Sequence, residues 1–412
     1  MIKWLNNNIG TASYMEGAPY CEKHGDVCLD VRDLVDKSGN TLQSIRDKIE
    51  EGVQLLRKGN KIVICCDYGM SRSNSIAVGI IVKYESRPFE VVVEDVLEII
   101  GEGAIKVEVL NMVRVSLDQQ GTSESKSKIL VTGASGFIGR GLVAELGQYA
   151  CKVEALSSKE INLEEELVRL DLYVSKIRPS HIIHLANPRI YTCNGAMGKT
   201  LAMLKNILDI CITHEVKLIY PSGWEVYSGY ASKGLLASES LPLYSKGTYG
   251  ETKYLCEQLI RNYGIQHDLS YSILRFPPLY GAQSDRPRFI YNFIDKALKN
   301  QPITTHIYNN GSPHLDLLCI DDAVKALSQI IMGNLDGEYN IGTGKIISTK
   351  KVAELIVEAV NSKSEILHSY IDGYAPNIIM DASKFKRQSD WNPTISFETW
   401  IVQQVRSIMN TR

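Results

Sequence analysis

The segment from Cys66 to Arg72 joins a thiol to a guanidinium across five intervening residues. An apolar run at residues 61–65 precedes it and another at residues 76–82 follows it, so a strand, a loop and a helix are expected. In such a loop, successive N–H groups and the helix N-terminus converge on one point, which suits a tetrahedral oxyanion. The same field favours a thiolate nucleophile at Cys66, while Arg72 can grip phosphate oxygens bidentately and Ser73 can donate to the sulfur. We expect the rest of the loop to bind phosphate through Asp67, Tyr68, Gly69, Met70 and Ser71.

A glycine-rich turn forms a second candidate site. Gly133, Gly136 and Gly139 follow the apolar run at residues 129–131 and open an amphipathic run at residues 141–147. This spacing predicts a dinucleotide-binding turn: the first glycine allows a tight turn, the second lets the backbone approach a pyrophosphate, and the third lets helix and strand pack closely. The helix N-terminus would then face the phosphates with free N–H groups. We expect the cofactor also to contact the other residues of this turn, Ser135, Phe137 and Ile138.

A tyrosine and a lysine provide candidate proton chemistry. Tyr249 and Lys253 are four residues apart, which places them on one face of a helix. The lysine charge favours the phenolate, so the tyrosine can act as an acid or a base near neutral pH. We therefore expect this pair to transfer protons beside a nicotinamide cofactor.

The end of the second strand after the glycine turn bears on the choice of cofactor. This strand is expected at residues 152–156, and Ser158 and Lys159 follow it closely. A site that selects NAD usually has an acidic residue near this strand end, for the ribose hydroxyls. We see none at this strand end, whereas Ser157, Ser158 and Lys159 can hold a 2′-phosphate. The sequence therefore favours NADP, with NAD as the alternative.

The elements that must position these residues alternate between strands and helices. Strands are expected at residues 26–31, 61–65, 128–131, 152–156, 181–185, 217–220 and 270–274, and residues 41–56 have the apolar spacing of a helix. This alternation predicts an α/β fold, with a doubly wound parallel sheet of Rossmann type in the second part. A polar stretch rich in small residues indicates a flexible linker at residues 118–127, so domains are expected at residues 1–117 and 128–412.

The composition excludes several classes of function. The chain has 412 residues and a net charge of −2, which gives no electrostatic case for nucleic acid or an anionic membrane as a partner. No apolar run approaches the roughly 20 residues of a transmembrane helix, and the start lacks the apolar segment of a signal peptide. The nine cysteines and eight histidines show no metal-ligand spacing, so we expect reduced thiols, a cytoplasmic location and no bound metal.

With these features, residues 1–117 resemble the dual-specificity branch of the cysteine-dependent protein tyrosine phosphatases. The resemblance rests on the Cys66 loop, the strand before it and the helix after it. It implies that Cys66 takes up a phosphoryl group and that an aspartate on an upstream loop protonates the leaving oxygen. Asp33 and Asp36 both qualify as that general acid. The family usually has a histidine before the nucleophile, but this chain has Cys65, which we expect to be a buried strand residue.

The chain from about residue 127 to its C-terminus resembles the extended short-chain dehydrogenase/reductase family, in its nucleotide-sugar epimerase and dehydratase group. The motifs fall in family order: residues 133–139, 184–186 and 226–227, Tyr249 with Lys253, and residues 275–281, 316–322, 339–344 and 381–393. The resemblance implies a small C-terminal substrate subdomain, a nucleotide-sugar substrate and a homodimer as a candidate assembly. It further implies cofactor contacts from Ser158, Lys159, Asn162, Leu163, Leu185 and Ala186, and substrate contacts from Glu225, Tyr280 and His314.

Three departures from the family pattern bear on the activity. The position of the catalytic serine or threonine is Gly223, with Ser222 one residue earlier as a candidate replacement. The Asp-Glu pair of the 4,6-dehydratases is Trp224 and Glu225 here, so dehydratase chemistry is disfavoured and epimerase or ketoreductase chemistry remains. The arginine that contacts the nucleotide diphosphate is replaced by Leu315.

Three functions therefore compete. The sequence favours a bifunctional enzyme that hydrolyses a phosphate monoester and also oxidises, reduces or epimerises a nucleotide sugar. The phosphate donor would be a phosphorylated small molecule or a phosphoprotein. The alternatives are an oxidoreductase with a regulatory phosphatase-like domain, and a cofactor-binding sensor that lost catalysis at Gly223.

Overall fold

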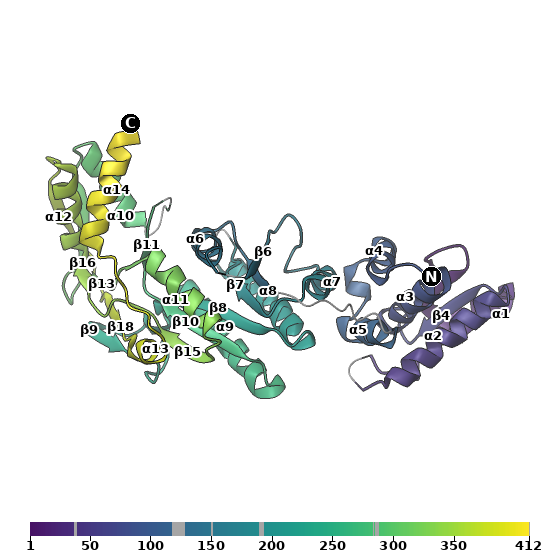
Figure 1. The fold of residues 1–412 in the computed structure, drawn as a ribbon. Coiled ribbons are helices and arrows are strands. Elements are labelled where there is room, and N and C mark those ends of the chain that lie inside the picture. Colours follow the sequence, from purple (N-terminus) through teal and green to yellow (C-terminus); the bar gives the residue numbers. More distant parts are fainter. Residues whose placement is uncertain are drawn as a thin grey trace. The chain divides into compact units, whose positions relative to one another are not determined.

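The computed structural model describes residues 1–36, 39–117, 128–149, 151–188, 193–282, 284 and 288–411. The chain divides into two compact units, whose elements are labelled in Figure 1. Unit 1 comprises Met1–Ser125 and Ile161–Ile177, and unit 2 comprises Lys126–Glu160 and Arg178–Arg412. The stretch predicted as a linker, residues 118–127, lies outside the described residues.

Unit 1 is an α/β unit with one sheet. Its elements are β1 (Lys3–Trp4), β2 (Ile9–Ser13), α1 (Tyr14–His24), β3 (Val27–Asp30), α2 (Leu42–Arg57), β4 (Ile62–Cys66), α3 (Ser71–Glu85), α4 (Phe89–Ile100), η1 (Glu102–Ala104), α5 (Val107–Ser116) and α7 (Leu167–Ile177). The strand order is β1-β2-β4-β3, with β2 and β3 parallel to β4 and the short β1 antiparallel at the edge. The strands predicted at residues 26–31 and 61–65 are confirmed as β3 and β4.

Helix α2 shows how the sequence builds this unit. The side chain of Thr41 caps the helix by accepting a hydrogen bond from the N–H of Ser44. The buried residues of α2 include Ile45, Ile49 and Val53, which recur at helical spacing and join the core of unit 1. The predicted helix at residues 41–56 is therefore confirmed.

Helix α7 belongs to unit 1, although it follows β6 of the second unit along the chain. Val168 and Leu172 pack into the core of unit 1. The carboxylate of Asp171 is fully buried and accepts hydrogen bonds from Arg114, at 2.8 Å, and from Asn111, at 3.1 Å. The predicted domain boundaries did not include this segment, because its contact partners lie more than fifty residues upstream.

Unit 2 is built on a six-stranded parallel sheet. Its elements are β5 (Lys128–Thr132), α6 (Phe137–Leu146), β6 (Lys152–Leu156), β7 (His181–His184), α8 (Asn194–Thr213), β8 (Lys217–Gly223), η2 (Trp224–Tyr227), β9 (Ser232–Ala237), α9 (Gly247–His267), β10 (Tyr271–Phe276), β11 (Leu279–Tyr280), α10 (Arg288–Leu298), β12 (Ile303–Ile307), β13 (His314–Leu315), β14 (Leu318–Cys319), α11 (Ile320–Met332), β15 (Gly337–Asn340), β16 (Ile347–Ser348), α12 (Thr349–Val360), β17 (Ile366–Tyr370), β18 (Pro376–Met380), α13 (Ser383–Gln388) and α14 (Phe397–Thr411). The sheet order is β15-β10-β8-β7-β5-β6, and every neighbouring pair is parallel. The predicted parallel Rossmann-type sheet and its five predicted strands are confirmed.

The order of this sheet determines where a ligand can bind. Strand β5 lies between β6 and β7, so the chain leaves β5 toward one neighbour and returns to its other side. In open α/β sheets, ligands bind outside the carboxyl ends of the strands at such a reversal. The glycine turn follows β5 at this point.

The C-terminal part of unit 2 adds four two-stranded sheets: β9 with β18, β11 with β14, β12 with β17, and β13 with β16. Helix α12 packs against both α10 and α14, and Figure 1 shows these helices gathered near the C-terminus. This arrangement fits the expected small C-terminal subdomain.

Within the described ranges, no helix has both the length and the apolar character needed to cross a bilayer. The same residues contain no group of three or more His, Cys, Asp or Glu side chains that could hold a metal ion. All nine cysteines are free thiols.

Candidate functional sites

The glycine turn of unit 2 is a tight cradle that side chains would fill. Gly133 has a φ of +69°, and a Cβ there would lie 2.6 Å from the backbone nitrogen of Ala186. A Cβ at Gly139 would collide with the carbonyl oxygen of Gly133. Helix α6 begins directly after Gly136 without a side-chain cap, so its first N–H groups are open to an anion. These features fit a dinucleotide pyrophosphate.

A cavity of about 590 Å³ joins this turn to the catalytic candidates. From the turn and the end of β7 it is lined by Phe137, Ile138, Leu185 and Ala186. From β8, η2 and α9 it is lined by Tyr220, Ser222, Gly223, Trp224, Glu225, Tyr249 and Lys253. The structure therefore brings together residues that the sequence places more than one hundred positions apart.

Lys253 is held in place by the end of β8. Its ammonium donates to the carbonyl oxygen of Pro221 at 2.9 Å and to the hydroxyl of Tyr220 at 3.2 Å. The same ammonium lies 5.9 Å from the ring centre of Tyr249, one turn earlier on α9. Burial lowers the pKa of Lys253. A cation in this position favours the phenolate of Tyr249 when a proton leaves it.

His184 is a cavity residue whose role the sequence did not reveal. Its Nδ1 lies 2.9 Å from the hydroxyl of Thr132, whereas its buried Nε2 has no hydrogen-bond partner in the described part of the chain. Burial lowers the pKa of His184 to about 3, so the ring is neutral. A buried polar atom without a partner carries a free-energy cost that a bound ligand can remove. Two signals were available: its place at the carboxyl end of β7 and its position in the motif at residues 184–186.

Glu225 occupies the space that a side chain at position 223 would need. A Cβ built on Gly223 would lie well inside contact distance of Oε2 of Glu225. Burial raises the pKa of Glu225 to about 7, and the cation of Lys253 opposes part of that rise. Gly223 lacks the serine or threonine hydroxyl expected at this position, and the carboxyl group of Glu225, with a pKa of about 7, occupies the space instead.

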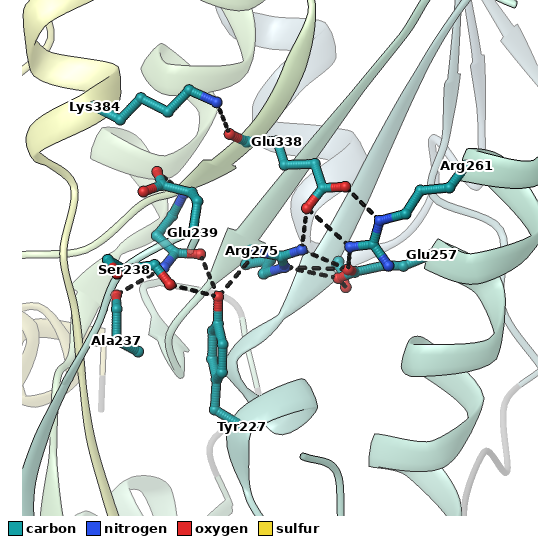
Figure 2. A network of polar contacts seen from close by, with 11 residues as sticks. Tyr227, Ala237, Ser238, Glu239, Glu257, Arg261, Arg275, Glu338 and Lys384 are labelled. Atoms are coloured by element: carbon teal, nitrogen blue, oxygen red, sulfur yellow. Dashed lines mark hydrogen bonds and ion pairs between the residues drawn. The ribbon is translucent and has the colours of Figure 1, made fainter. Parts of the chain in front are cut away.

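Ser222 is engaged elsewhere. Its hydroxyl donates to Glu257 at 2.6 Å. Figure 2 shows the buried network around Glu257, in which Arg275 donates to Glu257 at 2.7 Å and to the hydroxyl of Tyr227 at 2.9 Å. Glu338 and Arg261 extend this network. The hydroxyl proposed from the sequence as a replacement is thus held by a structural ion-pair network.

Two residues predicted to bind substrate do not line this cavity in the described part of the chain. Tyr280 is buried in the core, where it packs on Phe397 and donates to the carbonyl oxygen of Ile395. His314 lines a separate cavity of about 530 Å³, while its neighbour Leu315 lines the first one. Alternation along β13 explains the difference, since adjacent residues of a strand point to opposite faces.

The end of β6 differs from the sequence interpretation. The carboxylate of Glu160 folds back and accepts hydrogen bonds from the N–H and the hydroxyl of Ser157, at 2.9 and 2.8 Å. These bonds lower the pKa of Glu160. A carboxylate therefore does lie at this strand end, beside Ser158 and Lys159. The expectation of a strand end without a carboxylate is wrong, because a turn brings Glu160 back to Ser157. Further along, Asn162 donates to Glu165 at 3.0 Å, and Leu163 is buried.

The cysteine loop of unit 1 forms a cradle at the end of β4. Gly69 has a φ of +67°, and a Cβ there would collide with the backbone of Ser13. The N–H groups of residues 68–71 have no hydrogen-bond partner within the described part of the chain. The Sγ of Cys66 lies 3.3 Å from the hydroxyl of Ser73, which donates to the carbonyl oxygen of Met70 at 2.7 Å. The geometry suits an oxyanion bound in front of the thiol.

Cys65 lies in the sheet and not in the loop. It is fully buried, and burial raises its pKa. This placement agrees with the expectation of a buried strand residue.

Only one of the two candidate general acids faces the arginine of this loop within the described residues. The Oδ1 of Asp36 lies 3.9 Å from Nε of Arg72. Asp33 instead pairs with Lys48 at 3.2 Å, and its side chain is 62% exposed. Asp36 is therefore the candidate that lies beside Arg72, and its other carboxylate oxygen pairs with Lys106.

Comparisons with known proteins agree with the geometry of unit 2. The profile of the NAD dependent epimerase/dehydratase family matches residues 129–342. A putative UDP-glucose 4-epimerase of Methanocaldococcus jannaschii is 29% identical over 308 residues, which are 68% of this chain and 98% of that protein. Among solved structures, the UDP-glucose 4-epimerase of Thermus thermophilus in complex with NAD superposes with a TM-score of 0.62 at 22% identity, covering 69% of this chain and all of that one. The dTDP-glucose 4,6-dehydratase of Bacillus anthracis, also in complex with NAD, has a TM-score of 0.61 at 21% identity over 69% of this chain and 97% of that one.

Proposed function

The chain belongs to the NAD-dependent epimerase/dehydratase family, and from this premise we propose that unit 2 epimerises or reduces a nucleotide sugar. The observation that carries the proposal is the shared cavity, which places Tyr249, Lys253 and Glu225 beside the glycine turn. The similar proteins named above act on UDP- or dTDP-glucose according to their names, which suggests the substrate class.

A nicotinamide cofactor, when bound, supplies a hydride acceptor and donor. The open N–H groups after Gly136 would hold the cofactor's pyrophosphate, and the backbone of Ala186 lies on the other side of the turn. Glu160 supports NAD over the NADP expected from the sequence, because a carboxylate repels a 2′-phosphate and can accept hydrogen bonds from ribose hydroxyls.

The protein's own residues handle the proton. Tyr249 takes the proton of the reacting sugar hydroxyl, and the Lys253 cation stabilises the phenolate that precedes this transfer. Glu225, in its acid form, donates a hydrogen bond to the reacting oxygen from the space left by Gly223. A carboxylic acid kept neutral by burial can serve as such a donor. Trp224 offers no general acid, so dehydration is not proposed.

The test is turnover by the full chain, with NAD and a panel of UDP- and dTDP-hexoses for epimerisation, and with NADH and the corresponding keto sugars for reduction, followed by NMR of the sugar product. Formation of an epimer or of a reduced sugar that depends on Tyr249 supports the proposal. Tight cofactor binding without turnover of any sugar would instead favour the sensor hypothesis.

We further propose that unit 1 hydrolyses a phosphate monoester, so that the protein is bifunctional. The thiolate of Cys66 attacks phosphorus, and Asp36 gives its proton to the leaving oxygen. Water then hydrolyses the cysteinyl phosphate, and Ser73 donates to the departing sulfur. The supporting observation is the cradle of open N–H groups in front of Cys66.

Hydrolysis of an aryl phosphate tests this second activity. Cys66→Ser should abolish hydrolysis and still bind tungstate, whereas Arg72→Ala should lose both. Cys65→Ser is the matched control, since its thiol lies within the sheet, and it should change hydrolysis far less. Equal loss in the two cysteine variants would favour a redox or structural role for the pair.

A further inference from the structure

The arginine of the cysteine loop is fixed along one side by backbone carbonyls. Nη1 of Arg72 donates to the carbonyl oxygen of Leu34 at 2.9 Å and to that of Arg32 at 3.3 Å. The Arg72 side chain is only 9% exposed. The guanidinium therefore cannot rotate to offer this side to a ligand.

The other edge of the same guanidinium, formed by Nε and Nη2, already meets two carboxylates. Nη2 donates to Oδ2 of Asp67 at 2.5 Å. Nε is buried, and 3.9 Å from it lies the buried Oδ1 of Asp36; neither atom has a hydrogen-bond partner among the described residues. Side-on pairing through Nε and Nη2 is the geometry by which arginine grips an oxyanion bidentately. Asp67 thus takes one of the two donors that an oxyanion would use.

The side chain of Asp67 is more exposed than that of Asp36, which also pairs with Lys106. The side chain of Asp67 is 51% exposed, against 35% for Asp36. Asp67 also directly follows Cys66, so its movement requires no change in β4 or α3. An incoming oxyanion can therefore replace the Asp67 carboxylate on Nη2, at the cost of breaking a charge-assisted hydrogen bond.

We propose that Asp67 is an internal competitor for the oxyanion site and so lowers its affinity for oxyanions. This inference rests on the proposed phosphate site of unit 1. A free phosphate ion makes contacts only with the N–H groups and the arginine of the cysteine loop, and it must displace Asp67, so it binds weakly. A phosphate monoester that makes further contacts outside the loop offsets this cost. Asp67 thus weakens the binding of esters and of free phosphate by the same factor, and it speeds the release of the phosphate product.

The experiment measures tungstate and phosphate binding to the full chain by calorimetry. Asp67→Asn and Asp67→Ala should each raise the affinity for both anions about tenfold. This factor corresponds to the lower end of the range for a charge-assisted hydrogen bond, because Asp67 is half exposed. Asp95→Asn is the matched control: it removes the same charge from unit 1 at 53% exposure, where Asp95 pairs with Arg87. It should change binding less than twofold. For aryl phosphate hydrolysis, the inhibition constant of phosphate should fall in the Asp67 variants by the same factor.

The outcomes separate the two proposals. Wild-type tungstate binding that both Asp67 variants leave unchanged or weaken would overturn the inference, because Asp67 would then be a support for Arg72. Absence of binding in the wild type and in both Asp67 variants would overturn the phosphate site itself and the inference with it. Tighter binding in Asp67→Asn and Asp67→Ala that Arg72→Ala abolishes is the expected result.

Discussion

Replacing Glu225 tests whether this carboxyl has taken the place of the hydroxyl missing at Gly223. If the acid form of Glu225 donates to the reacting oxygen, turnover in the wild type should fall as pH rises through about 7. Glu225→Gln keeps a neutral donor of similar shape, so it should retain turnover at pH 6 and lose the decline above pH 7. Glu225→Ala should lower kcat about 10²–10³-fold, the cost of removing one preorganised donor.

A serine at position 223 provides the reciprocal test. Because its Cβ would clash with Oε2 of Glu225, Gly223→Ser alone must displace the carboxyl group and should lower turnover. In the Glu225→Ala background the space is open, so the same serine should restore much of the lost rate. Steady-state turnover of the four proteins over pH 5.5–9 gives the full cycle. Equal effects of Gly223→Ser in both backgrounds would refute the reasoning, as would a wild-type profile without a transition near pH 7.

The same carboxyl should also affect stability. The pKa of Glu225 rises from 4.5 to about 7 on folding, so the folded state binds the proton more tightly. The tighter proton binding of Glu225 therefore stabilises the folded state fully below about pH 4.5, and this stabilisation is lost as the pH rises toward 7. By pH 7 the free energy of unfolding has fallen by about 3 kcal/mol. Glu225→Gln should then be more stable than the wild type at pH 8 and equal to it near pH 4.5. Urea unfolding at the two pH values measures this, and an equal difference at both would contradict the assignment.

Three further predictions concern other parts of the chain. The wild type should bind NADH more tightly than NADPH in fluorescence titrations. Glu160→Gln should reduce this difference in affinity, whereas Lys159→Ala should not. Tighter binding of NADPH by the wild type would restore the NADP assignment. Tyr249→Phe should lower kcat at least about 10²-fold without changing the Kd for NADH, and unchanged turnover would show that the phenol carries no proton. Asp171→Ala leaves a buried arginine unpaired and should cost unit 1 about 3–5 kcal/mol in urea unfolding, and a loss below about 1 kcal/mol would mean that α7 is not part of its core.

The sequence by itself determined the local frames of both sites. The strand, loop and helix around Cys66 and around Gly133 were predictable because apolar runs and glycine spacing act over a few residues. Tyr249 and Lys253 shared a helical face for the same local reason. The parallel sheet followed from the regular alternation of strands and helices.

Tertiary structure alone decided the contacts that tune these sites. Glu225 fills the space beside Gly223. Asp36, and not Asp33, faces the arginine of the cysteine loop. Both contacts depend on the direction in which a side chain points from a turn, which the sequence does not show. Glu160 reaches the end of β6 by a turn that no periodicity signals. Helix α7 has an ordinary amphipathic sequence, and its apolar residues fit the core of unit 1 through partners far away in the chain. Local patterns specify which element forms, whereas the surface that an element finds is determined by packing among distant segments.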